Sequence, residues 1–261
     1  MSLTRKTRGR PFCWLFNLRA LTRGIVTRMR YDAASRRFRA VSKRHALWFA
    51  HEGQAYYACK RGIERRLEIL GETYFLSRIP FSRGDLVVDC GANVGELKHW
   101  FVERGLDVEY IGIEPAPLEY ACMKDNVAPS AAWNVGLWHE DGEMEFYLSS
   151  QMADSSLIRP PRYERIVKVP VRRLDSLLPD RRIKLLKLEA EGAETEVILG
   201  ASGILDNIDY ISADVDWERG VEQETTLPAV TNLLLGRGFE LVAVGRKRLT
   251  ALYRNTARSG G

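Results

Sequence analysis

The sequence predicts an α/β fold: a mostly parallel sheet with helices on both faces, ending in a C-terminal antiparallel hairpin and preceded by a basic N-terminal helical extension. From residue 85 onward, short apolar runs alternate with segments of about ten residues that have helical periodicity. The first strand leads directly into a turn with two glycines. Only a few residues around GRKR separate the last two strands, which is too short for a crossover helix, so these strands should pair antiparallel.

The alternation can be followed from the first strand to the C-terminus. Strands are expected at 85–91, 108–115, 131–138, 143–148, 183–192, 209–216, 239–245 and 249–255. Helices are expected between them at 96–105, 116–126, 193–201 and 227–238. One long segment, residues 149–178, interrupts this rhythm. It contains prolines and several arginines, and we interpret it as an insertion that covers the substrate.

The chain divides into an N-terminal extension, residues 1–83, and a domain that carries the sheet, residues 84–261. Residues 1–50 hold thirteen Lys and Arg against one acid, a net charge of +12, and the remainder has a net charge of −7. A cap region is expected to follow, with strands at 46–50 and 55–60 and a helix at 63–79. Within the extension, apolar side chains at helical spacing predict an amphipathic helix with arginines on its other faces: Trp14, Leu18, Leu21, Ile25 and Met29.

Cysteine spacing, hydropathy and charge indicate the cellular compartment of the protein. The four cysteines have no spacing typical of a metal site or a redox motif, so they are expected to be reduced thiols in a cytoplasmic protein. No apolar run approaches the roughly 18 residues of a membrane span, and the N-terminus does not resemble a signal peptide. The basic arm suits peripheral contact with the anionic inner face of a membrane. Packing on the protein itself or in a homo-oligomer is the alternative.

The turn DCGANVG is the first segment that carries chemistry. Gly91 and Gly95 allow the backbone to approach a ligand closely at the carboxyl end of a strand, where open parallel sheets bind their ligands. The spacing is not that of the dinucleotide motif, because Asn93 stands at the position of its second glycine. An acid, Asp89, precedes the turn. This combination favours a cofactor with an amino-acid end, such as S-adenosylmethionine, over one with a pyrophosphate.

The next two strands supply further candidate contacts for such a cofactor. Glu114 ends the second strand, where a carboxylate can accept hydrogen bonds from both ribose hydroxyls. Asn134 and Val135 end the third strand and are expected to border the adenine.

Acidic residues cluster at the ends of the fourth and fifth strands. Methyl transfer to an alcohol requires removal of the hydroxyl proton, and a carboxylate base or a metal-bound hydroxyl can assist it. Glu191 is the leading candidate for the catalytic acid, with Glu189 and Asp214 in support. Glu194 and Glu196 are equally well explained as first-turn acids that the helix dipole favours. A site for Mg²⁺ or Mn²⁺ would use the four carboxylates of the cluster: Glu189, Glu191, Asp214 and Asp216.

The motifs VVDCGANVGE, IGIEPAPLEY, NVGLW with DGE, DSSL and LKLEAEGAETEVILGA, in this order, resemble the FkbM family of S-adenosylmethionine-dependent O-methyltransferases. The resemblance covers roughly residues 85–245 and implies a Rossmann-like class I methyltransferase sheet. It also implies methylation of a hydroxyl on a sugar, a glycolipid or a natural product, as in polysaccharide biosynthesis. The family usually has an aspartate where this chain has Glu189, which puts the role of that residue in doubt.

Two other functions remain open on the sequence alone. An RNA methyltransferase could use the basic arm to hold a phosphate backbone, but the catalytic end has no aromatic platform of the N/D-P-P-Y type, so nucleic acid is the less favoured partner. A non-catalytic module would bind the cofactor or dock a partner without turnover. In the favoured interpretation the partner is a glycan or small-molecule acceptor that bears a hydroxyl.

Overall fold

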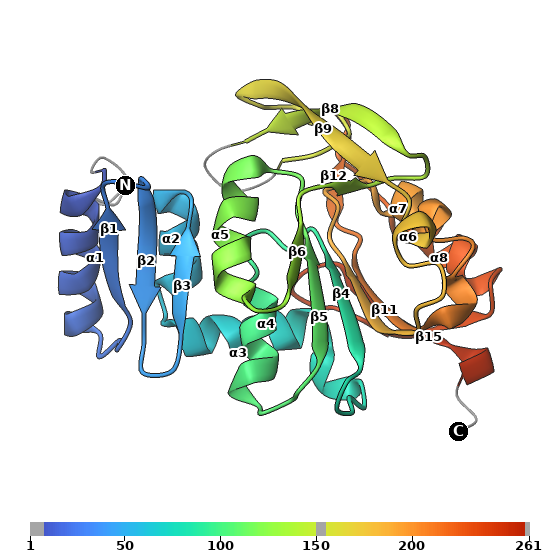
Figure 1. The fold of residues 1–261 in the computed structure, drawn as a ribbon, viewed down its shortest axis with the longest axis horizontal. Coiled ribbons are helices and arrows are strands. Elements are labelled where there is room, and N and C mark those ends of the chain that lie inside the picture. Colours follow the sequence, from blue (N-terminus) through green and yellow to red (C-terminus); the bar gives the residue numbers. More distant parts are fainter. Residues whose placement is uncertain (1–7, 150–154, 259–261) are drawn as a thin grey trace.

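The computed structural model describes residues 8–149 and 155–258, and its central feature is a seven-stranded sheet (Figure 1). The order is β14-β15-β11-β10-β4-β5-β6. Neighbouring strands are parallel except at β15, which runs antiparallel to both β11 and β14. The strands are β4 (Leu86–Cys90), β5 (Glu109–Ile113), β6 (Ala131–Trp133), β10 (Ile183–Leu188), β11 (Ile208–Asp214), β14 (Phe239–Val244) and β15 (Thr250–Asn255).

Helices cover both faces of this sheet and enclose two apolar cores. On β4, Val87 packs into one core, whereas Leu86 and Val88 pack into the other. Because both faces are covered, the central strands are continuous apolar runs in the sequence. The helices are α4 (Glu96–Glu103) and α5 (Pro117–Val127) on one face, and α6 (Leu174–Leu177), α7 (Glu194–Gly200) and α8 (Leu227–Leu235) on the other (Figure 1).

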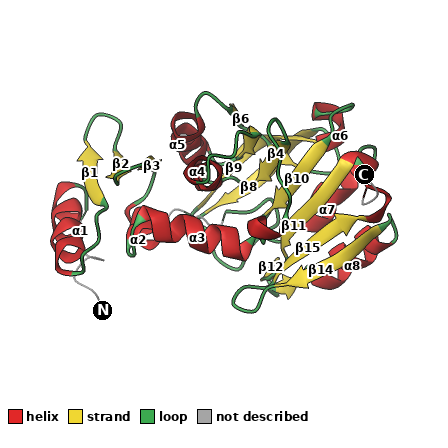
Figure 2. Ribbon diagram, turned by 90° about the horizontal axis from the view of Figure 1, so that it is seen from below, coloured by secondary structure: helices red, strands yellow, loops and turns green. Residues whose placement is uncertain are grey.

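The N-terminal segment forms a small α/β unit that continues into the first core. Its helix α1 packs on a three-stranded antiparallel sheet, and α3 lies beside α4 (Figure 2). One apolar cluster joins Phe12 and Phe16 of α1 to Trp100 and Phe101 of α4. The elements are α1 (Arg10–Thr22), β1 (Arg28–Asp32), β2 (Arg37–Val41), β3 (Ala46–Phe49), α2 (Glu52–Cys59), α3 (Ile63–Thr73) and the 3-10 turn η2 (Leu76–Arg78).

The predicted N-terminal helix is present but shorter than its apolar pattern indicated. It ends at Thr22, and Gly24 follows in a left-handed conformation with φ of 66°, which turns the chain away from the helix. Ile25 and Met29 therefore lie outside the helix, and Met29 is buried in β1. With 13 residues, α1 is too short to span a bilayer, and no other helix in the described ranges is long and apolar enough.

The strand predicted at 55–60 is wrong, because this stretch belongs to α2. Ala55, Ala58 and Cys59 are buried together at a spacing of three and four residues, which is the periodicity of a helix rather than a strand. The run AYYAC contains no polar residue that would reveal this period in the sequence.

The third predicted strand divides into two. β6 belongs to the main sheet, whereas β7 (Gly136–Leu137) joins a separate sheet of order β7-β9-β8 that lies above the strand ends (Figure 1). The predicted insertion contributes β9 (Arg165–Arg172) to that sheet, antiparallel to β8 (Gly142–Leu148). Residues 150–154 of the insertion lie outside the described residues. The remaining short elements are β12 (Trp217–Arg219), β13 (Glu224–Thr225), η3 (Leu205–Asn207) and η4 (Thr256–Arg258).

Candidate active site

A cavity of about 990 Å³ opens at the carboxyl ends of the parallel strands. Its floor comes from the residues that follow β4, β5 and β10, as the parallel sheet predicts. Its walls come from two parts of the chain that the sequence did not connect with the site, namely α2 with α3 and the turn between β14 and β15. The N-terminal unit therefore helps to build the cavity.

The glycine turn after β4 lies in this floor and brings two strand ends together. Gly91 has a φ of 68°, and a Cβ atom there would lie 1.8 Å from the carbonyl oxygen of Glu189. Only glycine fits this approach of β4 to β10. At Gly95, with φ of 78°, a Cβ atom would lie 2.5 Å from Cγ1 of Val127, so this glycine is required for the packing of α5.

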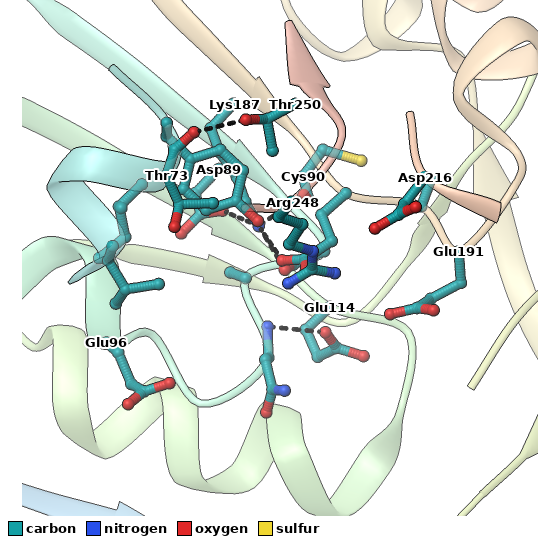
Figure 3. A pocket seen from close by; sticks show the side chains of 18 of the residues that line it. Thr73, Asp89, Cys90, Glu96, Glu114, Lys187, Glu191, Asp216, Arg248 and Thr250 are labelled. Atoms are coloured by element: carbon teal, nitrogen blue, oxygen red, sulfur yellow. Dashed lines mark hydrogen bonds and ion pairs between the residues drawn. The ribbon is translucent and has the colours of Figure 1, made fainter. Parts of the chain in front are cut away.

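Asn93 and Glu114 lock the glycine turn to the end of β5. The backbone N–H of Asn93, a left-handed residue with φ of 52°, donates to Oε2 of Glu114 at 2.8 Å. Oε1 of Glu114 accepts the N–H of Ala116 at 2.8 Å. Burial raises the pKa of Glu114 to about 8. Glu114 thus presents a buried carboxyl group to the cavity, with its orientation fixed by two backbone donors (Figure 3).

The two residues predicted beside the adenine have different positions. Val135 lines the cavity, whereas Asn134 does not. The side-chain amide of Asn134 donates to the carbonyls of Glu114 and Pro115 at 2.8 and 3.1 Å. Asn134 therefore supports the end of β5.

A buried lysine holds the floor of the cavity together. The ammonium group of Lys187 lies 2.9 Å from Oδ1 of Asp89 and 3.1 Å from Oε2 of Glu189. It also donates to the carbonyls of Cys90 and Gly91, at 3.2 and 2.7 Å. Asp89, which was predicted to contact the cofactor, is 1% exposed, and the charge of this lysine neutralises its carboxylate.

Arg248 forms the second half of the same network. Its guanidinium contacts Glu189 at 2.8 Å and also contacts Asp214. Burial acts to raise the pKa of Glu189, but the charges of Lys187 and Arg248 outweigh it and lower the pKa to about 2. For Asp214, burial and then repulsion from Glu189 raise the pKa. Of Glu189 and Asp214, Glu189 therefore carries the charge.

These contacts change the interpretation of the acidic cluster. Glu189 and Asp214, predicted to assist catalysis or to bind a metal, are engaged by cations instead. Asp214 does not line the cavity, although Asp216 does. Among the described residues, no group of three or more His, Cys, Asp or Glu side chains has an arrangement that could hold a metal ion. The described donor set therefore does not fit Mg²⁺ or Mn²⁺.

The neighbouring acids of α7 are structural. Oε1 of Glu194 accepts the N–H groups of Ala190 and Gly192 at 2.9 and 3.2 Å, and its Oε2 accepts the hydroxyl of Thr226. Glu196 makes a bidentate ion pair with Arg219. Both residues shape the turn that precedes α7.

Glu191 is the acid that this turn presents to the cavity. It has a left-handed φ of 50°, unusual for a residue with a side chain, and Gly192 follows with φ of 94°. The hydroxyl of Ser156, from the insertion, donates to the carbonyl of Glu191 at 2.8 Å and fixes the turn. Figure 3 shows the Glu191 side chain extending into the space bordered by Glu114 and Arg248. Strained backbone of this kind is concentrated at functional sites.

One sign of the buried network is visible in the sequence. Lys187 stands in the middle of the apolar run IKLLKL, and a charge inside a strand covered on both faces requires a buried partner. Arg248 lies in a short basic hairpin turn that resembles an ordinary solvated turn, so no local pattern distinguishes it.

The model of the family described as Methyltransferase FkbM domain matches residues 89–241, more than half of the chain. This chain belongs to the FkbM methyltransferase family. The predicted family is therefore confirmed. So is the predicted fold class, a Rossmann-like methyltransferase sheet with a C-terminal antiparallel hairpin, which β14 and β15 form.

The individual relatives have low sequence identity to this chain. The 2-O-methyltransferase NoeI of Sinorhizobium fredii is 26% identical over 180 residues, which cover 60% of this chain and 73% of the relative. Methyltransferase 1 of Beauveria bassiana is 25% identical over 161 residues, which cover 49% of this chain and 65% of the relative. Among solved structures, a SAM-dependent methyltransferase from Aquifex aeolicus is similar with a TM-score of 0.44 and 12% identity, over 73% of this chain and 96% of that chain.

Replacing Lys187 with Met should destabilise this FkbM methyltransferase by about 3–5 kcal/mol at pH 7, because the buried Asp89 loses the one cation that pairs with it among the described residues and Glu189 keeps only Arg248. The folded-state pKa of Glu189, about 2, is below its ordinary value of 4.5, so its contribution is present above pH 4.5 and is lost as the pH falls toward 2. The deficit of the variant should therefore shrink in acid. Urea unfolding at a series of pH values measures it.

Lys184→Met is the matched control. Lys184 lies in the same strand and pairs with Asp209, but Asp209 keeps a second partner in Arg182. A loss of about 1 kcal/mol or less is expected for it. If the two variants unfold with equal free energies at pH 7, Lys187 does not have the neutralising role assigned to it.

Proposed function

We propose that this methyltransferase transfers the methyl group of S-adenosylmethionine to a hydroxyl group of a sugar, glycolipid or related small molecule, with Glu191 as the base. The observation that carries the proposal is the position of Glu191: it is aimed into the cavity from the end of β10, while the neighbouring Glu189 and Asp214 are held by Arg248. The relative named 2-O-methyltransferase supports an oxygen acceptor.

The described residues fit the cofactor in several ways. Gly91 and Ala92, in the turn after β4, line the floor of the cavity, where their backbone can contact the ligand. Glu114 can accept hydrogen bonds from ribose hydroxyls with the oxygen lone pairs that its two backbone donors do not use. Val135 supplies an apolar contact for the adenine ring. When bound, the cofactor supplies an electrophilic methyl group.

The protein's own residues handle the acceptor. In this proposal the Glu191 carboxylate accepts the proton of the acceptor hydroxyl, and bound S-adenosylmethionine would supply the methyl group to that oxygen. Asp216 borders the same space and can orient the hydroxyl by accepting a hydrogen bond. Lys187 and Arg248 keep Glu189 ionised and engaged in ion pairs, so Glu189 is not assigned the role of the base.

We also propose that the enzyme attaches to an anionic membrane surface through the outer face of α1. The inner face is already used: Phe12, Phe16 and Ala20 are buried against the three-stranded sheet. Trp14 and Leu18 are 65% and 47% exposed on the opposite side.

Charge on and around this face supports a lipid partner. Leu21, the third apolar side chain of the face, is 66% exposed. Arg10 lies one turn before Trp14 on the same side of the helix, and the exposed Arg23 follows its last turn. An aromatic and aliphatic face can enter the headgroup boundary, while each nearby arginine contributes about 1 kcal/mol against anionic lipid.

Replacing Glu114 with Ala should weaken the binding of S-adenosylmethionine by about 1–3 kcal/mol, the scale for leaving buried hydrogen-bonding groups without their partner. Calorimetry with S-adenosylmethionine, S-adenosylhomocysteine and NAD measures it, and thermal unfolding shows whether the loss of the Asn93 and Ala116 contacts also lowers stability. Binding of NAD without binding of either sulfur compound would show that S-adenosylmethionine is not the cofactor.

Replacing Glu191 with Gln should reduce methyl transfer by about 100-fold, because the amide keeps the shape and removes the base. Affinity for S-adenosylhomocysteine should be retained. The assay is transfer of radiolabelled methyl groups into a cell extract that is then fractionated into lipid, polysaccharide, RNA and small molecules. Glu222→Gln, an exposed acid that does not line the cavity, is the control and should have normal activity. Near-normal transfer by the Glu191 variant would exclude it as the base.

Co-sedimentation with vesicles that contain anionic lipid should require the α1 face and should fall with salt. The double variant Trp14→Ser/Leu18→Ser should lose binding, whereas the control Leu199→Ser/Leu235→Ser, two exposed leucines of α7 and α8, should keep it. If the α1 variant binds vesicles as well as the parent, the face is not inserted. If the variant instead abolishes self-association of a protein that ignores vesicles, the face is an interface between copies.

A further inference from the structure

Four basic side chains of the cavity form no ion pair with the acids that the structure describes. Arg61, Arg78, Arg246 and Lys247 all line it and are exposed, and no ion pair involves them within the described ranges. The other cations of the cavity differ in this respect. Arg66 pairs with Glu96, Arg65 with Glu68 and Glu72, and Lys187 and Arg248 with the buried acids of the floor. The unpaired charges are thus confined to the two walls.

These walls are held firmly to each other and to the sheet. The hydroxyl of Thr250, at the start of β15, donates to the carbonyl of Thr73 at 2.8 Å. The hydroxyl of Ser212 in β11 donates to the carbonyl of Tyr74 at 2.9 Å. The end of α3 is therefore fixed against the hairpin that carries Arg246 and Lys247. Arg248, the next residue, is anchored by its acids, so the preceding two cations are attached to a fixed point.

The backbone at Phe75 is a second and independent observation. Phe75 has a φ of 55°, a conformation that is rare and costly for a bulky side chain, and it lines the cavity. The guanidinium of Arg78 lies over its ring, 5.7 Å from the centroid. Asn93 and Glu191, two further left-handed residues, also line the cavity. The wall thus combines an aromatic face with cations at a point where the chain tolerates strain.

We propose that the methyl acceptor is a glycan or glycolipid that bears a phosphate or pyrophosphate group, which these four cations bind. This inference rests on the proposed function, since it names the substrate class of the same site. Four unpaired cations match a group with two or more negative charges better than a single carboxylate, and arginine forks suit phosphate oxygens. The acids Glu191 and Asp216 repel such a group, so the phosphate lies at the basic walls, away from the hydroxyl that is methylated.

Calorimetry with inorganic pyrophosphate tests the site directly. The full chain is first saturated with S-adenosylhomocysteine, so that the cofactor subsite is closed to the probe. We expect pyrophosphate to bind the parent protein, with an affinity that falls as salt increases, and to bind Arg246→Gln/Lys247→Gln at least 10-fold more weakly. The control Lys124→Gln/Arg237→Gln removes two exposed basic residues that do not line the cavity, and it should bind as the parent does.

The outcomes separate this inference from the proposed function. Binding of S-adenosylhomocysteine without pyrophosphate, or equal pyrophosphate binding by all three proteins, overturns the inference and leaves the proposed function intact. Failure to bind S-adenosylhomocysteine overturns the proposed function itself. In the labelled extract, a methylated product retained by an anion-exchange resin and released by phosphatase or pyrophosphatase supports the inference. A neutral product, or one destroyed by ribonuclease, overturns it.

Discussion

The architecture of the site depends on one buried ammonium group. Lys187 belongs to β10, and its ammonium group pairs with Asp89 of β4 and with Glu189, so that Asp89 has its counter-charge at the junction of two parallel strands. It also holds the carbonyls of Cys90 and Gly91, the residues at which the glycine turn begins. A single cation therefore sets the charge of the floor and the path of the turn. The cost of burying it is offset only because acids and carbonyls surround it.

This network also bears on which carboxylate we propose as the base. Several carboxylates follow neighbouring strands, and in a shared cleft they would raise one another's pKa values. Here Lys187 and Arg248 occupy Glu189, Arg248 also contacts Asp214, and backbone N–H groups occupy Glu194. Glu191 is placed by a strained turn. Ion pairs and backbone geometry thus give different surroundings to acids that the sequence presents as equivalent.

The sheet and its hairpin could be predicted because the strands are apolar runs in the sequence and most of them are followed by a segment with helical periodicity. The sequence also located the strand ends, and with them Glu114 and Glu191. It missed α2, because AYYAC has no polar residue to reveal a helical period, and it overextended α1 past Gly24. The roles of Arg248 and of the basic walls could not be predicted from the sequence. They depend on the contact between the β14–β15 turn and the end of α3, where Thr250 bonds to Thr73, 177 positions away in the chain.

The N-terminal unit contributes both to the apolar core that it shares with α4 and to a wall of the cavity. Its helix α1 uses one face for the shared core and leaves a second apolar face in solvent, while α3 forms a wall of the cavity. α3 packs against α4, and Thr73 at its end accepts a hydrogen bond from Thr250 of the hairpin, so the N-terminal unit is joined directly to the elements of the active site. A surface bound by α1 and an acceptor held by the α3 wall would then share one rigid frame. An amphiphilic acceptor with a phosphate between its lipid and its sugar has the charge and polarity that this arrangement suits.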